Sequence, residues 1–517
     1  VPVSAALGEG LDALLDAAVQ AAHGPPPDPW RALVSGPVQT CVRTIARLLA
    51  PAAHAAGLPP VFAATQWLDG GSTLHAPAAA ETAAARMVRE SGMPRDEALP
   101  TARFAQVDRL TRFFALPRAL PGSQRSARID RVLTGRYTAY PAMAGLLGGV
   151  FYLTFHIIGP CLSRLLARGI AWLADAADGA LTALDAGPLL HSLVCEGVFA
   201  GVGSVAAFLP VILALFFFLS LLEDTGYLAR VAFVMDRPLR RLGLSGQSAV
   251  PLLLGFGCSV PGVLAARTLP TRRDRALTIV LTPCMSCSAK APVYAAFAAA
   301  FFPGRSAVVF LALYALGILA AAVAARLLGR TVLRGEAASF VMELPDYRWP
   351  NARSVLRRMR VRTREFLTRA FTIILAASVG VWVLRTFTPT WRVAANAGES
   401  LLAVVGQALA PVFAPLGFGD WRAATALVTG LLAKETVLST LGVLLGGDLT
   451  AALPGVFSPA AAASYLVFTA LYAPCVAAQA AMRQELGSGL GTLAAAAGSC
   501  AAAWCAAAVV YRIAILI

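Results

Sequence analysis

Long uncharged apolar segments recur along the chain from Pro141 onward, and no comparable segment precedes this residue. A helix needs about 20 apolar residues to cross a hydrocarbon core about 30 Å thick. Segments of about that length predict spans near 141–160, 197–222, 276–302, 306–325, 366–388, 422–445, 460–482 and 486–511. We therefore predict an all-α polytopic membrane protein with about eight transmembrane helices, preceded by a small soluble helical domain.

The apolar segment 242–266 differs from a simple span, because helix-breaking residues interrupt it. These residues are Pro251, Gly255, Gly257, Pro261 and Gly262. Arginines flank the segment on both sides. Broken backbone at membrane depth is tolerated only where it is buried in protein or lines a water-filled cavity. This segment is therefore predicted to be broken or re-entrant.

Composition and charge agree with a membrane protein. Hydrophobic residues make up 58% of the 517 positions and charged residues 14%, while the net charge is +15. The arginines gather in loops beside the apolar segments, a pattern that sets orientation in a membrane and gives no reason to expect a nucleic-acid partner. We expect the basic loops 230–241, 267–275 and 326–364, and the N-terminal domain with them, on the cytoplasmic side of a bacterial inner membrane.

The order of motifs repeats between the two halves of the membrane region. The first half carries Leu-Gly-Leu at 242–244, a broken segment around Cys258 and then Pro283-Cys284; the second carries Leu-Gly-Phe at 416–418, a segment around Glu435 and then Pro474-Cys475. The charge pattern has the two halves entering their broken segments from opposite sides, as inverted-topology repeats do. We place the repeats at 131–335 and 366–517, with a basic cytoplasmic loop at 336–365 between them.

Two thiol motifs lie in the first repeat. Cys258 stands among Gly255, Gly257 and Pro261, which free backbone carbonyls that, with the sulfur, can face a cation. The other interpretation of this motif is a glycine-rich packing seam with a small buried cysteine.

Cys284 and Cys287 are three residues apart, on one helical face, and suit a soft or borderline divalent metal. A Cys-x-x-Cys can also be a redox pair, which would make the protein a membrane thiol oxidoreductase.

Lys434 and Glu435 form a charged dipeptide inside an apolar span. Such a residue costs about 3 kcal/mol or more unless it is paired or hydrated, so a functional role is the default. Adjacent residues do not face each other on a helix, and each therefore needs a partner elsewhere. The alternative is that both reach an interface at the end of a shorter span.

Other polar residues are less specific. Glu223 and Asp224 end an apolar span and form either a helix stop or a cation-attracting or gating mouth. His156 and His191 are isolated, and packing or interfacial roles are expected for them. The only lysines, Lys290 and Lys434, follow alanines, so the sequence holds no phosphate-binding P-loop.

Several long segments resemble the ferrous iron transporter B family of bacterial GTPase-coupled Fe(II) uptake proteins. They are Leu222 to Arg230, Gly255 to Pro261, Arg273-Asp274-Arg275, Met285-Ser286-Cys287, Met342 to Arg348, Ala433-Lys434-Glu435 and Tyr472 to Cys475. This sequence differs in having Ser259 where Asn is common, Lys290 where Arg is common, and Cys284 as an additional thiol.

The resemblance implies a domain order and a function. Residues 1–22 would be the end of a G domain, with Ser4-Ala5 resembling its base-contacting motif, and 23–130 a cytoplasmic helical domain and linker. The implied cargo is Fe2+, with GTP and Mg2+ implied only for the intact protein. It also implies a small SH3-like cytoplasmic partner, and it leaves room for a homo-oligomer.

On these grounds we predict ferrous iron import. The expected metal contacts are Cys258, Cys284, Cys287, Cys475 and Glu435, and the expected gating or pore residues are Glu223, Asp224, Gly255, Gly257, Pro261, Lys290 and Lys434. The alternatives are a transporter of the same fold for another divalent metal or a nucleoside, and the thiol oxidoreductase.

Overall fold

The computed structural model of the protein describes residues 3, 10–24, 36–69, 76–111, 121–184, 187–334, 344–366, 368, 372–394, 396–446 and 449–516. Within these ranges every regular element is a helix, and the only β-contact is an isolated bridge between Phe387 and Val393. The predicted all-α architecture is confirmed. Contacts divide the chain into two units, 1–120 and 121–517.

The first unit is helical. Its helices are α1 (Leu11–His23), α2 (Pro37–Ala55), α3 (Pro60–Leu68), α4 (Ala78–Ser91) and α5 (Arg95–Thr111). Residues Cys41, Ile45 and Leu49 of α2 follow one another at helical spacing and are buried in its core. The proposed base-contacting residues Ser4 and Ala5 lie outside the described residues.

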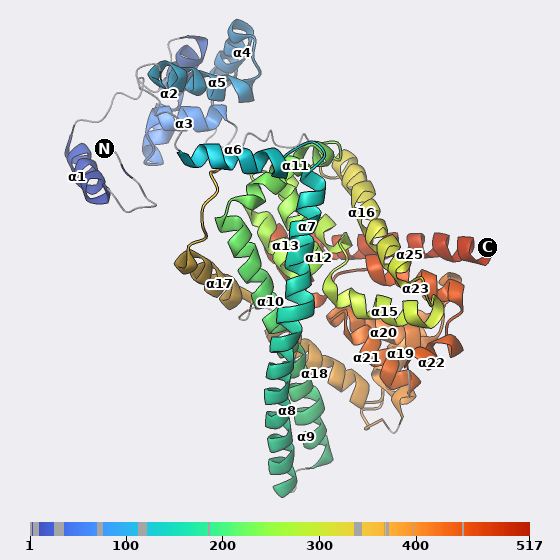
Figure 1. Cartoon of the computed structure of the whole chain (residues 1–517). Coiled ribbons are helices and arrows are strands. Elements are labelled where there is room, and N and C mark those ends of the chain that lie inside the picture. Colours follow the sequence, from blue (N-terminus) through green and yellow to red (C-terminus); the bar gives the residue numbers. More distant parts are fainter. Residues whose placement is uncertain are drawn as a thin grey trace. The chain divides into compact units, whose positions relative to one another are not determined.

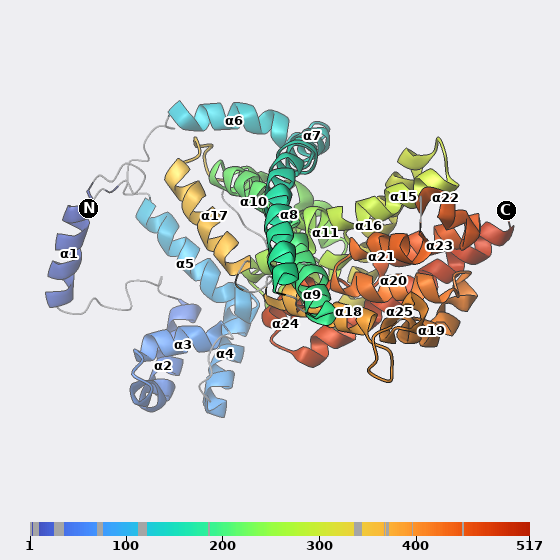
Figure 2. The same ribbon diagram turned by 90° about the horizontal axis from the view of Figure 1, so that it is seen from below.

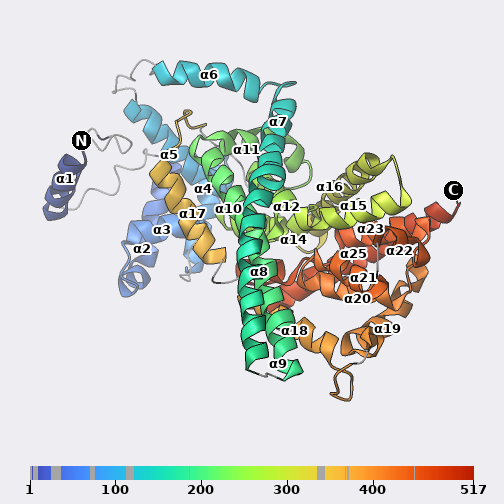
Figure 3. The ribbon, with the colours of Figure 1, turned by 60° about the horizontal axis from the view of Figure 1, so that its bottom comes forward.

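A long helical hairpin dominates the start of the second unit. After α6 (Pro121–Leu133), α7 (Ala139–Tyr152), the π-helical segment η2 (Leu153–Ile158) and α8 (Gly159–Ala183) form one continuous helix. The chain returns through α9 (Pro188–Ser192), the π-helical segment η3 (Leu193–Phe199) and α10 (Ala200–Asp224). The hairpin of α8 and α9 projects away from the rest of this unit (Figure 1, Figure 3).

The prediction that the first span ends at Pro160 is wrong. Proline lacks a backbone N–H but is accepted in the first turn of a helix, and Pro160 occupies the first turn of α8 directly after the π-helical segment. Gly159 permits this course, because a Cβ there would lie 2.4 Å from the Thr154 carbonyl oxygen and 2.8 Å from Val211 Cγ2 of α10.

The rest of the first repeat consists of short helices separated by breaks. These are α11 (Tyr227–Arg240), α12 (Ala249–Gly257), α13 (Ser259–Ala265), α14 (Arg272–Leu281), α15 (Ala291–Phe301) and the longer α16 (Ser306–Thr331). Cys258 is extended, with φ −155° and ψ 131°, and separates α12 from α13. A second break at 285–287 separates the 3-10 turns η6 (Thr282–Cys284) and η7 (Ser288–Lys290). The predicted interruption of 242–266 is confirmed.

The second repeat has the same plan. After α17 (Ala352–Phe366) in the basic loop, its helices are α18 (Thr372–Thr386), α19 (Leu401–Phe413), α20 (Trp421–Leu432), α21 (Thr436–Leu445), α22 (Leu449–Ala452), α23 (Pro459–Leu471), α24 (Val476–Leu486) and α25 (Gly489–Leu516). Breaks fall at 433–435 and 472–475. The sequence did not predict α17, inside the basic loop, or α19.

Each half of the membrane unit packs one helix into the core of the other half. Val293, Tyr294 and Phe297 of α15 pack in a cluster formed mainly by α20 to α23 and α25. Conversely, Ala478 and Met482 of α24 pack with residues of α10, α12 and α13. Figure 2 shows α15 beside α22 and α23. The helix that follows the second break of each repeat is therefore built into the other half.

The number of candidate spans agrees with the prediction of about eight. The described residues contain five helices long and apolar enough to cross a membrane, and nine spans when each of four sharply bent helix pairs counts as one. One bent pair, α2 with α3, belongs to the first unit. Eight therefore remain in the second unit, which spans the bilayer several times.

Candidate metal site at the helix breaks

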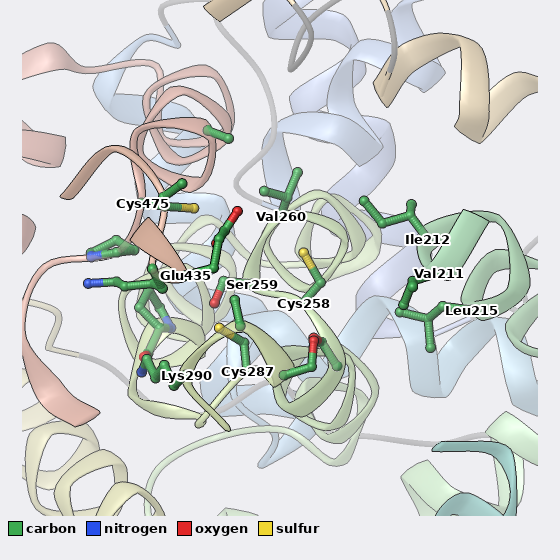
Figure 4. Close-up of a pocket in the computed structure, with 18 of the residues that line it drawn as sticks. Val211, Ile212, Leu215, Cys258, Ser259, Val260, Cys287, Lys290, Glu435 and Cys475 are labelled. Carbon is green, nitrogen blue, oxygen red and sulfur yellow. The ribbon is translucent and has the colours of Figure 1, made fainter. Parts of the chain in front are cut away.

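The helix breaks at 258, 285–287, 433–435 and 472–475 all contribute to one cavity of about 110 Å³ (Figure 4). Its lining residues at the breaks are Gly257, Cys258, Ser259, Cys287, Ser288, Ala289, Lys290, Ala433, Lys434, Glu435, Pro474 and Cys475. Positions more than 200 residues apart in the sequence thus face the same space. The predicted convergence of Cys258, Cys287 and Cys475, with Glu435 nearby, agrees with this placement.

The three thiols share a structural position. Cys258 and Cys475 are the N-caps of α13 and α24, and Cys287 precedes η7, which runs on into α15. None of the three forms a disulfide. Each of these thiols therefore lies where a break passes into a helix, and in its thiolate form a cysteine can bind a metal. The local fold therefore presents each sulfur in a setting suited to a cation ligand.

Lys434 is buried, with 3% of its surface exposed. Its ammonium donates a hydrogen bond of 2.5 Å to the Ala473 carbonyl oxygen and lies 3.0 Å from the centroid of the Tyr472 ring. Both partners belong to the break at 472–475, where a carbonyl has left the helical ladder. Lys434 therefore has the separate partner that its sequence position required, and it does not extend to an interface.

Lys290 is held in a similar way. Its ammonium, also 3% exposed, donates to the carbonyl oxygens of Ala470 at 2.6 Å and Pro283 at 3.3 Å. Ala470 belongs to the second repeat, so this contact joins the two halves beside the cavity.

Glu435 is the only acidic side chain among the described residues that line the cavity. It is half-buried and forms no salt bridge with any residue in the described ranges. Its neighbour Lys434 points to a different break. The carboxylate is therefore placed to contribute negative charge to whatever occupies the cavity.

Two predicted glycines lie where the breaks approach each other. A Cβ on Gly255 would lie 3.0 Å from the Thr282 carbonyl oxygen. Gly257 borders the cavity and accepts a 3.0 Å hydrogen bond from Ser288 Oγ at its carbonyl oxygen. This hydrogen bond joins the break at Cys258 directly to the break at 285–287. Pro261 does not line this cavity.

The expectation that Cys284 and Cys287 share a helical face is wrong. The helix ends in η6 at Cys284, and Met285 is extended, with φ −69° and ψ 129°. Cys284 is not among the cavity-lining residues, and it packs instead against an apolar cluster that includes Met285 and Leu281. The sequence could not reveal this, because the spacing of three suits either a helix or a break.

The acidic pair at the end of α10 lies away from this cavity. Glu223, together with Pro261, lines a second cavity of about 580 Å³. Asp224 accepts hydrogen bonds from Arg358 of α17 and from the Asn351 backbone N–H, each at 2.7 Å. Glu223 also lies 3.4 Å from Arg358. These contacts tie α10 to α17.

A cluster of polar contacts around the buried Arg230, near the end of α10, was not predicted. Arg230, 1% exposed, donates two hydrogen bonds of 3.0 Å to Asp130 of α6. It also donates to the carbonyl oxygens of Gly226 and Pro345, and it lies 4.1 Å from the centroid of the Tyr347 ring. Tyr347 in turn donates a 2.9 Å bond to Asp130. Asp130 is about 100 residues from its partner, too far for a sequence pattern to indicate.

Comparisons with known proteins agree with the motifs. Residues 205–301 and 367–489 match the Gate family, described as "Nucleoside recognition", and 310–362 match "Ferrous iron transport protein B C terminus". "Fe(2+) transporter FeoB" of Staphylococcus aureus strain COL is 40% identical over 364 residues, covering 70% of this chain and 55% of the relative. The protein of the same name from Methanocaldococcus jannaschii is 36% identical over 369 residues, covering 69% and 54%.

A third relative is a fusion. The "Fe(2+) transport protein A/Fe(2+) transporter FeoB fusion protein" of Porphyromonas gingivalis is 35% identical over 441 residues, covering 75% of this chain and 51% of the relative. The chain spans about half the length of these curated relatives.

Proposed function

This chain belongs to the ferrous iron transporter B family, and from that premise we propose that it moves Fe2+ across a bacterial inner membrane through the cavity at the helix breaks. One observation carries the proposal: three thiols and one carboxylate, drawn from both repeats, surround a single cavity inside the membrane unit. Relatives named as Fe(2+) transporters support the cargo.

The ligand chemistry suits an ion that must bind and leave. Fe2+ lies near the weak-binding end of the affinity order of first-row divalent ions, so one or two thiolates hold it without trapping it. Each thiol loses its proton when it binds metal. Glu435 supplies further negative charge. The ion would pass among these groups with part of its water shell replaced.

Cavity size argues against the nucleoside alternative. Pockets for small organic ligands are usually about 300–1,000 Å³, whereas this cavity is about 110 Å³. A water molecule takes up about 30 Å³ in the liquid, so the space suits a partly hydrated ion. The oxidoreductase alternative is also weakened, because Cys284 does not line the cavity with Cys287.

Orientation, energy coupling and partners form part of the same proposal. The arginine-rich loops support a cytoplasmic location for the end of α10, with Glu223 and Asp224. GTP and Mg2+ are proposed for the intact protein through the family. The fused relative supports a small partner of the Fe(2+) transport protein A kind for this chain as well.

The test is Fe2+ uptake into proteoliposomes by the intact protein and by Cys258→Ser, Cys287→Ser, Cys475→Ser and Glu435→Gln. Removing even an outer-sphere partner of a metal ligand typically costs 10–100-fold in affinity or activity. We therefore expect each thiol variant to lose at least about tenfold in uptake at limiting Fe2+.

Cys505→Ser is the matched control, because Cys505 is an exposed thiol on α25. It should transport like the unaltered protein. Full uptake by a protein that carries all three cavity substitutions would overturn the proposal and leave these thiols as packing residues.

A further inference from the structure

A second group of metal-ligand side chains lies on the α8–α9 hairpin, apart from the cavity at the helix breaks. Asp178 belongs to α8, His191 to α9 and Cys195 to η3. One ligand atom from each lies within 4.8 Å of the other two. Asp178 Oδ1 is 2.6 Å from His191 Nε2 and 3.7 Å from Cys195 Sγ.

The hairpin brings these residues together by simple geometry. His191 and Cys195 are four residues apart on the returning helical segment and therefore point to one side of it. Asp178 lies on the opposite helix of the hairpin, near the end of α8, where the chain turns back within a few residues. In the sequence His191 stands isolated, because its nearest partner is a cysteine four residues away and its second partner lies across the turn.

The cluster lies beyond the apolar part of the hairpin. Trp172 and Leu173, both more than half exposed, precede Asp175 and Asp178 on α8. Tryptophans are enriched where a membrane helix meets water, so the aqueous boundary falls near this turn of α8. Asp178 is exposed, and His191 and Cys195 are half-buried. Ions in the surrounding water can reach these ligands.

The cluster and the acidic end of α10 lie on opposite sides of the membrane. His191 and Asp224 are joined by an almost unbroken run of helix. At about 1.5 Å per residue, this run is on the order of 50 Å long, which exceeds a hydrocarbon core of about 30 Å. If Asp224 is cytoplasmic, the cluster faces the outside; this placement of the cluster rests on the proposed function and its orientation.

We propose that Asp178, His191 and Cys195 form a binding site for a divalent first-row transition metal, separate from the cavity. A carboxylate, an imidazole and a thiolate are a mixed donor set that suits borderline ions and excludes Mg2+, which prefers oxygen ligands. Metal bonds to such donors are about 2.0–2.3 Å long, so two ligands of one ion lie no more than about 4.6 Å apart. The cluster already meets this spacing within a few tenths of an ångström.

Three protein ligands also leave coordination positions open to water. Sites that keep such positions exchange their ligands, whereas structural four-ligand sites are closed. The competing role is a plain Asp178–His191 ion pair with the thiol as a bystander. That role predicts no dependence of metal binding on Cys195.

The first experiment is a Co2+ titration of the purified full chain, followed by the thiolate-to-cobalt absorption band. A background of Cys258→Ser, Cys287→Ser and Cys475→Ser removes the cavity thiols. We expect one Co2+ per chain to bind in this background, no band after a further Cys195→Ser, and affinity at least about tenfold lower after His191→Gln or Asp178→Asn.

The controls are Cys161→Ser and Asp175→Asn, which alter an exposed thiol and an exposed carboxylate of the same helix. Both should leave the band unchanged. A band that survives Cys195→Ser, or that Cys161→Ser removes, would overturn the proposal.

A second measurement uses the chain with its cavity cysteines unchanged. In intact cells, a membrane-impermeant maleimide should label Cys195 in the otherwise unaltered chain, and Co2+ should slow this labelling at least about tenfold, while equal Mg2+ should not. Labelling that Co2+ does not slow would refute the site. Because neither readout measures uptake, the site can fail while iron transport through the cavity stands, and the reverse also holds.

Discussion

Replacing Asp130 with asparagine should loosen the attachment of α6 to the membrane unit. The carboxylate accepts both hydrogen bonds of the Arg230 fork and a third from Tyr347. Asp130→Asn leaves the guanidinium, 1% exposed, without its counter-ion. Removing one partner of a buried ion pair costs about 3–5 kcal/mol. Since the Asp130 side chain is 20% exposed, we expect the lower part of that range or somewhat less, about 2–3 kcal/mol.

The assay is hydrogen–deuterium exchange of the purified protein, read for α6 and for residues 344–351. A loss of about 2–3 kcal/mol in the local opening free energy corresponds to about 30- to 150-fold faster exchange, at 1.4 kcal/mol for each factor of ten. Tyr347→Phe removes only one hydrogen bond and keeps the ring over Arg230, so its cost should be about 1 kcal/mol. Arg131→Gln is the control, because it removes an exposed charge from the same helix.

The same cluster predicts a pH dependence. Partial burial acts to raise the pKa of Asp130, but hydrogen bonds from Arg230 and Tyr347 outweigh it and hold this pKa below its usual value. The pair therefore stabilises the fold fully above about pH 4, the ordinary range of aspartate, and this contribution is lost as the pH falls through the lowered pKa. Exchange in α6 that is unchanged by Asp130→Asn at neutral pH would refute the reasoning.

Three further predictions concern other parts of the chain. Gly262→Ala should cost about 1–3 kcal/mol in thermal unfolding, because the new Cβ would lie 2.7 Å from Thr282 Cγ2, whereas Gly148→Ala, with open space around it, should not destabilise. Burial raises the pKa of Cys41 to about 11, so this thiol should resist iodoacetamide at pH 8 in the folded protein and react after denaturation; equal rates in the two states would contradict the buried position. A cysteine introduced at position 237 should be labelled by an impermeant maleimide only in inside-out vesicles, and labelling in intact cells would reverse the proposed orientation.

The breaks in the helices were predictable because their causes are local. Glycines and prolines around Cys258, and a charged dipeptide at Lys434, mark places where a continuous span is unfavourable. The convergence of the breaks followed from the repeated order of motifs. The hydrogen-bond partners at each break could not be predicted from that order, because no sequence pattern indicates that the Ala473 carbonyl oxygen accepts a hydrogen bond.

Other features depended on distance or on tertiary context. The continuous helix through Pro160 uses a π-helical segment that hydrophobic patterning does not reveal. The hairpin cluster joins Asp178 and His191 across a turn, and Arg230 finds Asp130 a hundred residues away. In each case the sequence supplies the residue type, while the fold alone supplies the neighbour.

The two buried lysines have a consequence for ion discrimination. Sodium, potassium and magnesium ions bind to oxygen atoms, and carbonyls released at helix breaks are suitable ligands for them. At Ala470 and Ala473 those oxygens already accept hydrogen bonds from the side chains of Lys290 and Lys434. An abundant hard cation would have to displace a covalently attached competitor, whereas an ion with affinity for sulfur would not. Selectivity for a sulfur-binding ion would then depend on the occupied carbonyl oxygens as much as on the available thiols.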